Sequence, residues 1–353
     1  MSDKPPVIFI SGRFRSGSSF LWQLFDQLPG FCAWYEPLHP QLLAAIEHTK
    51  PKTDHVGITD YWSAYRQHPE FQSHYQATFA TEQLYLEATD QAPELQQYIE
   101  RLIALSAPEV PVLQFNRMDL RLSWLKSHFP QATVIHTERN PLQLYHSQRK
   151  HIPEPQRHQP AYWDAYELMP WCLSLSETFP FLLSTEHEHA FFRCYLLQRM
   201  SSLCAASQAD LVINLDQDVF EKPAFIRQLM SVVSLTSEQQ KQLKAKVHLP
   251  EIPVFDEQLT DTLSSLMTAA DLLLTASGLA GHLGQKPLSY IKQSHPQFWQ
   301  SQSGISHSEV QRLLAQMNSY QSEMTRILAE NEDLKNQLEA LTIQQVKDTD
   351  HHE

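Results

Sequence analysis

The segment 12–19, with the sequence GRFRSGSS, is the part of the chain that most constrains its fold. It follows the apolar run 7–10 and leads into the apolar run 20–25, an order that predicts a buried strand, a tight loop and a helix. The loop holds two of the chain's eight glycines, which allow a sharp turn. Backbone N–H groups and the positive end of the helix dipole then converge on one point. The loop is therefore predicted to bind phosphate.

The spacing of this loop is that of a Walker A motif, but Ser18 occupies the position of the motif's lysine. The positive charge comes instead from Arg13 and Arg15, earlier in the loop. The missing lysine argues against ATP hydrolysis. A P-loop kinase or phosphotransferase is therefore the alternative interpretation rather than the first one.

A second candidate anion site follows another predicted strand, at 132–137. Arg139 comes at the end of this strand, Pro141 suits the first turn of a following helix, and Ser147 lies about two turns into it. An arginine fork and a hydroxyl in this arrangement can hold a phosphate. Ligands of α/β sheets bind beyond the carboxyl ends of the strands, where both candidate sites lie. Two such sites predict a ligand with phosphates at its 5′ and 3′ positions.

Alternation of strands and helices predicts an α/β fold, in which a mainly parallel sheet is covered on both faces to give three layers. Strands are expected at 7–10, 110–115, 132–137 and 211–215, and the main helices at 20–25, 120–129, from Pro141 onward and at 191–206. Two prolines predict an extended or turning path for 31–40. The aromatic stretch 49–107 is expected to be mostly helical, most regularly at 82–105.

Composition argues against several classes of function. A formal net charge of −13 opposes binding to nucleic acids and to anionic membranes. No apolar run approaches the length of a membrane span, no secretory signal is recognisable, and the four cysteines lack metal-ligand spacing, which favours a reduced, cytoplasmic protein. The cluster 186–189 of glutamates and histidines suggests a metal site, but a solvated polar loop explains it better, so no metal is expected.

The segment 306–346 has a different character and contains neither proline nor glycine. Seam residues recur there at alternating spacings of three and four from Val310 to Leu341, over more than four heptads. The one polar seam residue, Asn331, occupies an a position, where asparagine commonly fixes a parallel two-stranded register. We therefore predict a homodimer through a parallel coiled coil at 310–341, with a lone helix packed on the domain, or a helix that binds another protein, as alternatives.

The two anion motifs, in this order and each after a strand, resemble the family of sulfotransferases that use 3′-phosphoadenosine 5′-phosphosulfate (PAPS). The segment 15–19 is similar to the family's 5′-phosphosulfate loop, in the arginine form of protein-tyrosine and many bacterial and carbohydrate sulfotransferases. The segment 139–141 with Ser147 is similar to its 3′-phosphate motif. The segment 212–223 resembles a later part of the family more loosely, with Asp216 in place of the usual glutamate. The resemblance spans roughly residues 7 to 235.

This resemblance implies a P-loop NTPase-like sulfotransferase architecture, with PAPS as the sulfuryl donor and 3′-phosphoadenosine 5′-phosphate as the product. The implied donor-binding residues are Arg13, Arg15, Ser16, Gly17, Ser18, Ser19, Arg139 and Ser147, and Arg15 is also expected to be catalytic. Glu36 belongs to an E-P-L segment like that of carbohydrate sulfotransferases, which makes it the first candidate for the general base. His39 is the rival, because imidazole suits proton transfer near neutral pH.

The expected activity is transfer of a sulfuryl group from PAPS to an acceptor hydroxyl, with a carbohydrate or glycan as the expected acceptor. The expected organisation is a sulfotransferase domain at 1–295 with an acceptor-side helical insertion at about 49–107, a linker at 296–305, the coiled-coil helix at 306–346 and a disordered tail at 347–353. The glycine-containing segment 277–284 is read as a flexible joint or as a loop that closes over the ligand. A non-catalytic, sulfotransferase-like scaffold that acts through its coiled coil is a further alternative.

Overall fold

The computed structural model describes residues 6–48, 58, 60–150, 152, 165–183, 189–218, 222–246 and 260–302, together with parts of a helix within 308–338. The chain forms two compact units, Met1–Gly304 and Ile305–Glu353. Among the described residues, no helix has both the length and the apolar composition that a membrane span requires.

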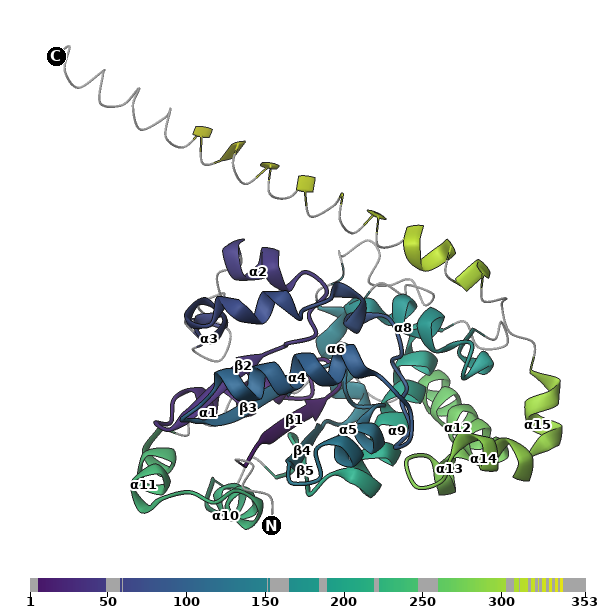
Figure 1. The fold of residues 1–353 in the computed structure, drawn as a ribbon. Coiled ribbons are helices and arrows are strands. Elements are labelled where there is room, and N and C mark those ends of the chain that lie inside the picture. The colour runs from purple at the N-terminus through teal and green to yellow at the C-terminus, as the bar shows by residue number, and fades with distance from the viewer. Residues whose placement is uncertain are drawn as a thin grey trace. The chain divides into compact units, whose positions relative to one another are not determined.

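Five parallel strands form one sheet in the order β2-β3-β1-β4-β5 (Figure 1). The strands are β1 (Ile8–Gly12), β2 (Phe31–Tyr35), β3 (Val110–Phe115), β4 (Thr133–Glu138) and β5 (Leu211–Asn214). The helices are α1 (Ser18–Asp26), α2 (Leu42–His48), α3 (Ser63–Gln67), α4 (Pro93–Leu105), α5 (Leu122–His128), α6 (Pro141–Arg149), α8 (Leu168–Leu175), α9 (Ala190–Gln208), α10 (Lys222–Val232), α11 (Ser237–Lys246), α12 (Asp261–Ala276), α13 (Leu279–His282), α14 (Leu288–Ser294) and α15 (Pro296–Ser301). This arrangement confirms the predicted α/β class.

Of the two paths predicted for 31–40, the first half of the segment takes the extended one and forms the strand β2. Phe31–Tyr35 pairs with β3 in parallel, from Phe31 beside Val110 to Tyr35 beside Gln114. Both prolines, Pro37 and Pro40, come after the strand, so they end it rather than prevent it.

The sheet separates two hydrophobic cores because successive side chains of a strand point to opposite faces. Phe9 lies in the core that includes side chains of α4, α5 and α9. Its neighbours Ile8 and Ile10 lie in the other core, with side chains of α1 and α10. The strands are therefore mostly apolar on both faces, as expected for a parallel sheet covered on both sides, and their polar side chains lie mainly toward the carboxyl ends.

The stretch 49–107 is less helical than predicted. Residues 49–57 and 59 lie outside the described part of the chain. The helix α3 and the 3₁₀ turns at Pro69–Ser73 and Ala77–Ala80 are short. The regular helix, α4, begins at Pro93 and not at 82, because Gln83 has a left-handed φ of 50° and proline favours the first helical turn.

The segment 277–284 is neither a flexible joint nor a lid. Ser277 is fully buried, and the carbonyl of Gly284 accepts hydrogen bonds from Ser123 Oγ and Gln208 Nε2. Gln208 is the last residue of α9, and β5 begins shortly after it. Gly284 therefore packs near the amino-terminal ends of the strands, away from their carboxyl ends. Within the expected linker, α15 packs on this unit, since Trp299 Nε1 donates to the Ser277 carbonyl at 3.1 Å.

The strand order places the two anion motifs side by side. From β1 the chain passes to β2 on one side of the sheet, and from β3 it passes to β4 on the other side of β1. Gly12, the last residue of β1, lies beside Thr137 of β4. This change of direction at neighbouring carboxyl ends is where open α/β sheets bind their ligands.

Candidate functional site

The loop after β1 is shaped by its two glycines. A Cβ on Gly12 would lie 2.2 Å from Thr137 Oγ1, so only glycine fits between β1 and β4. Gly17 is the N-cap of α1 and has a left-handed φ of 101°, which glycine adopts without strain. Arg15 has a φ of 73°, which is uncommon for a residue with a side chain. The local sequence thus produces the strand, loop and helix expected of a phosphate-binding segment.

The structure brings the two predicted anion motifs together through Arg15 and Ser147. Arg15 Nε donates a hydrogen bond to Ser147 Oγ at 3.0 Å, across 132 residues of sequence. Ser147 lies on α6, whose start is fixed by Asn140, because its side chain accepts hydrogen bonds from the backbone N–H groups of Leu142 and Gln143. Guanidinium and hydroxyl therefore meet at the carboxyl ends of β1 and β4.

The three loop serines make contacts with three different elements. Ser16 Oγ lies 2.8 Å from Thr137 Oγ1 of β4. Ser18 Oγ donates to Asn116 Oδ1 at 2.9 Å, just after β3. Ser19 Oγ lies 2.9 Å from the hydroxyl of Tyr35, the last residue of β2. These contacts tie the start of α1 to three neighbouring strands.

Arg13 does not share the position of Arg15. Its side chain is buried, with the guanidinium 4.1 Å from the centre of the Trp171 ring and 3.5 Å from an Asp119 carboxylate oxygen. Asp119 follows β3, and Trp171 lies in α8. Arg13 therefore contacts buried side chains that support the loop. Arg15 is the loop arginine that contacts the second motif.

Arg139 pairs with Asp216, the residue that stands in place of the usual family glutamate. Arg139 Nε lies 3.3 Å from Asp216 Oδ1, and the other oxygen of this carboxylate accepts a hydrogen bond from the Asn140 N–H at 2.5 Å. Burial lowers the pKa of Arg139 from its usual value, while Asp216 acts in the opposite direction. The aspartate thus holds the turn that ends β4.

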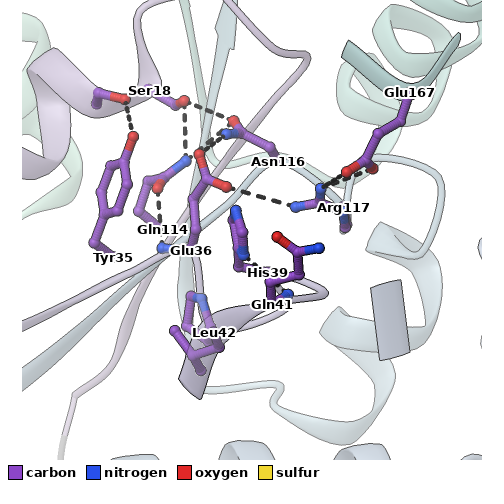
Figure 2. Close-up of polar contacts among 12 residues, drawn as sticks. Ser18, Tyr35, Glu36, His39, Gln41, Leu42, Gln114, Asn116, Arg117 and Glu167 are labelled. Carbon is purple, nitrogen blue, oxygen red and sulfur yellow. Dashed lines mark hydrogen bonds and ion pairs between the residues drawn. The ribbon is translucent and has the colours of Figure 1, made fainter. Parts of the chain in front are cut away.

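Glu36 lies directly after β2 and has a left-handed φ of 42°. Its carboxylate accepts a hydrogen bond from Asn116 Nδ2 at 2.5 Å and lies 3.5 Å from Arg117 Nη1 (Figure 2). Burial raises the pKa of Glu36, the charge of Arg117 opposes that rise, and the charge of Glu167 adds to it. A carboxylate whose pKa is raised toward neutrality is a better proton acceptor at neutral pH.

His39 lies close to Glu36 but is in a different chemical state. Its Nδ1 accepts a hydrogen bond from the Gln41 N–H at 3.1 Å (Figure 2). Burial, with a smaller contribution from the charge of Arg117, lowers the pKa of His39 to about 3. The side chain is therefore a neutral imidazole with its basic nitrogen already occupied, which makes it a weak proton acceptor.

Three functional candidates were missed in the sequence: Gln114, Asn116 and Glu167. Gln114 and Asn116 could have been noticed, because they are polar residues at the carboxyl end of an otherwise apolar strand. Glu167 gives no such signal. It comes from the N-terminus of α8, and both of its carboxylate oxygens accept from Arg117 Nη2 at 2.7 Å. Arg117 is thus bound between two carboxylates from distant parts of the chain (Figure 2).

Within the described residues, no three histidine, cysteine, aspartate or glutamate side chains are arranged to hold a metal ion. Of the cluster 186–189, residues 186–188 lie outside the described part of the chain, and His189 caps α9.

Comparison of the sequence with models of protein families gives a match. Residues 6–176 match the family model described as the sulfotransferase family. No curated protein matches the chain. The matched residues contain β1 to β4, the loop 12–19, Glu36 and the segment from Arg139 to Ser147. Residues 6–176, which carry both predicted anion motifs, therefore belong to the sulfotransferase family.

Proposed function

We propose that the protein transfers a sulfuryl group from PAPS to a hydroxyl group of a carbohydrate or glycan acceptor. The observation that carries this proposal is the hydrogen bond between Arg15 and Ser147. It joins the loop that resembles a 5′-phosphosulfate site to the helix that resembles a 3′-phosphate site. A ligand with phosphates at both positions matches that pairing better than ATP does.

The residues present fit this donor. The loop amides, the N-terminus of α1 and Arg15 would hold the 5′-phosphosulfate, and Arg139 with Ser147 would hold the 3′-phosphate. When bound, PAPS supplies the sulfuryl group and leaves as 3′-phosphoadenosine 5′-phosphate. Arg15 and the positive end of α1 stabilise the negative charge on the departing phosphate oxygen.

The chain's own contribution to the chemistry is proton removal. Glu36 accepts the proton of the acceptor hydroxyl, and the freed oxygen is then the nucleophile. The structure favours Glu36 over His39, because the pKa of Glu36 is raised and that of His39 is lowered to about 3. Beside Glu36, the rings of Tyr35 and Tyr61 stack with centroids 4.4 Å apart. Tyr61 is partly exposed, so it can offer the acceptor an aromatic ring that carries a polar hydroxyl. Such a surface supports a sugar as the acceptor.

We also propose that the protein is a homodimer through a parallel coiled coil at 310–341. From Tyr320 onward, the described apolar seam residues Tyr320, Ile327, Leu334 and Leu338 are exposed on their own helix. Glu330 and Lys335 occupy g and e positions five residues apart, the spacing of an interhelical ion pair in a parallel dimer. The four cysteines are free thiols, which supports a cytoplasmic location.

Two measurements test the sulfuryl-transfer proposal. Calorimetry should detect binding of 3′-phosphoadenosine 5′-phosphate, and transfer of ³⁵S from PAPS to glycans of the cell envelope should follow. Arg15→Ala should lower the transfer rate by about 10²- to 10³-fold, as loss of one charge-stabilising donor does. Lys126→Ala is the matched control, because Lys126 pairs with Asp210 at the opposite edge of the sheet. Binding of ATP with Mg²⁺ in place of the adenosine bisphosphate would overturn the proposal.

A further inference from the structure

The side chain of Asn116 connects the donor loop to the proposed base. Its Oδ1 accepts hydrogen bonds from Ser18 Oγ at 2.9 Å and from Gln114 Nε2 at 3.1 Å. Its Nδ2 donates to Glu36 Oε1 at 2.5 Å. The amide is therefore fixed in one orientation, because two donors occupy its oxygen and one carboxylate occupies its nitrogen (Figure 2).

Gln114 strengthens this arrangement from the interior of the sheet. It is fully buried near the end of β3. Its Nε2 also donates to Ser18 Oγ at 3.0 Å, and its Oε1 accepts from the backbone N–H of Glu36 at 3.3 Å. Both the backbone and the carboxylate of Glu36 are thus held by the two polar residues that end β3. A buried polar pair with all partners satisfied specifies one geometry.

We propose that Asn116 is a positioning residue that fixes and stabilises the Glu36 carboxylate for proton transfer, and that the donor loop holds Asn116 in place through Ser18. This inference rests on the proposed role of Glu36 as the base. The side-chain hydrogen bonds of Asn116 are with Ser18, Gln114 and Glu36, so its effect on the chemistry passes through Glu36. The serine that begins α1 at the donor site therefore also sets the orientation of the base on the neighbouring edge strand.

Other charged and titratable groups act on the same carboxylate. They are Arg117 after β3, Glu167 at the start of α8, and the hydroxyls of Tyr35, Tyr61, Tyr65 and Tyr166. The hydrogen bonds from Asn116 and Tyr35 and the charge of Arg117 lower the pKa of Glu36, whereas burial and the charge of Glu167 raise it. Removing the Asn116 donor must therefore raise the pKa of Glu36 and weaken its orientation.

The test follows Glu36 directly by carbon NMR of glutamate labelled at the carboxyl carbon, with the signal assigned through Glu36→Gln. In Asn116→Ala the Glu36 titration should move up by about 1 to 2 pH units, the value of a hydrogen bond to a charged group. Asn116→Asp keeps the shape but adds a second carboxylate, so it should move the titration further. Ser106→Ala is the control, since it removes a buried hydrogen bond to Trp34 without touching Glu36. An unmoved Glu36 titration in both Asn116 variants would overturn the proposal.

The kinetic arm separates this inference from the proposed activity. With ³⁵S-labelled PAPS and the acceptor glycan, Asn116→Ala should lower kcat by about 100-fold, with the KM for PAPS changed much less. Absence of transfer by the wild-type protein would reject the sulfuryl-transfer proposal and leave the NMR result standing. Wild-type transfer with an unchanged Asn116→Ala rate would reject the positioning role alone.

Discussion

At the scale of single residues, the two candidate bases differ in their ability to accept a proton. The cause is the set of contacts made by the His39 ring nitrogen and by the Glu36 carboxylate. Glu36 and His39 are three residues apart and both are partly buried. Nδ1 of His39 is bound by a backbone N–H, whereas the Glu36 carboxylate has one amide donor and one arginine beside it. Motif comparison alone left both candidates open, and the surrounding contacts distinguish them.

Glu36→Gln should therefore lower the sulfuryl-transfer rate by at least about 10²-fold, the lower end of what a general base contributes. His39→Ala should retain most of the activity. Because the pKa of Glu36 is raised, the wild-type rate should fall as the pH drops through that value and the carboxylate becomes protonated. This fall in rate at low pH is the acid limb of the pH profile. Because the pKa of His39 is about 3, the acid limb should persist in His39→Ala. A lost limb in His39→Ala would assign the base to the histidine.

At the scale of secondary-structure elements, the start of α8 is linked through Arg117 to Glu36, the proposed base. Glu167 is the N-cap residue of α8 and shares Arg117 with Glu36. Glu167→Gln should leave Arg117 paired with Glu36 alone, which lowers the pKa of Glu36. The acid limb of the rate profile should then move to lower pH, opposite to the shift expected for Asn116→Ala. Glu94→Gln, in the exposed first turn of α4, should leave the profile unchanged.

The close contact of β1 with β4 leads to a prediction about the stability of the fold. Gly12→Ala should lower the free energy of unfolding by about 1–3 kcal/mol, because the added methyl would overlap Thr137 at the strand ends. Gly281 is the matched glycine, since its Cβ would meet nothing within 4 Å and it lies in helix α13. Gly281→Ala should raise that free energy by about 0.5–1 kcal/mol. Urea unfolding of both variants measures the difference, and equal effects would contradict the steric explanation.

The elements that sequence patterns predicted are those with a strong local signal. The runs behind β1, β3, β4 and β5 are apolar because both faces of the sheet are covered. The five residues of β2 were not predicted as a strand, because the nearby prolines left an extended and a turning path open, and the pairing of β2 with β3 depends on residues about 80 positions away. Arg15 and Ser147 could be predicted because each belongs to a local sequence motif. The contacts of Asn116 and Glu167 could not, because their partners are distant in the sequence. Side chains that meet only in the tertiary structure produce no characteristic spacing in the sequence.

At the scale of the whole molecule, the exposed seam of the C-terminal helix predicts association. Leu334→Glu places a charge at a d position and should convert the proposed dimer to a monomer in sedimentation equilibrium. Ala315→Glu is the control, because position 315 lies on the outer side of the heptad and is exposed. A Leu334→Glu protein that remains dimeric would place the dimer interface elsewhere.

The residues that meet at the proposed donor site are far apart in the sequence, and this has a consequence for folding. Its contacts join residues 132, 121, 98 and 80 positions apart, so the loop after β1 gains its partners only when the chain through α6 has assembled. Contacts of this kind form late and slow the folding of a domain. A nucleotide that needs both strand ends binds only the finished fold. At a concentration 100 times its Kd, it would add about 2.7 kcal/mol to the stability of that fold. The donor would then also act as the ligand that keeps the two halves of its own site joined.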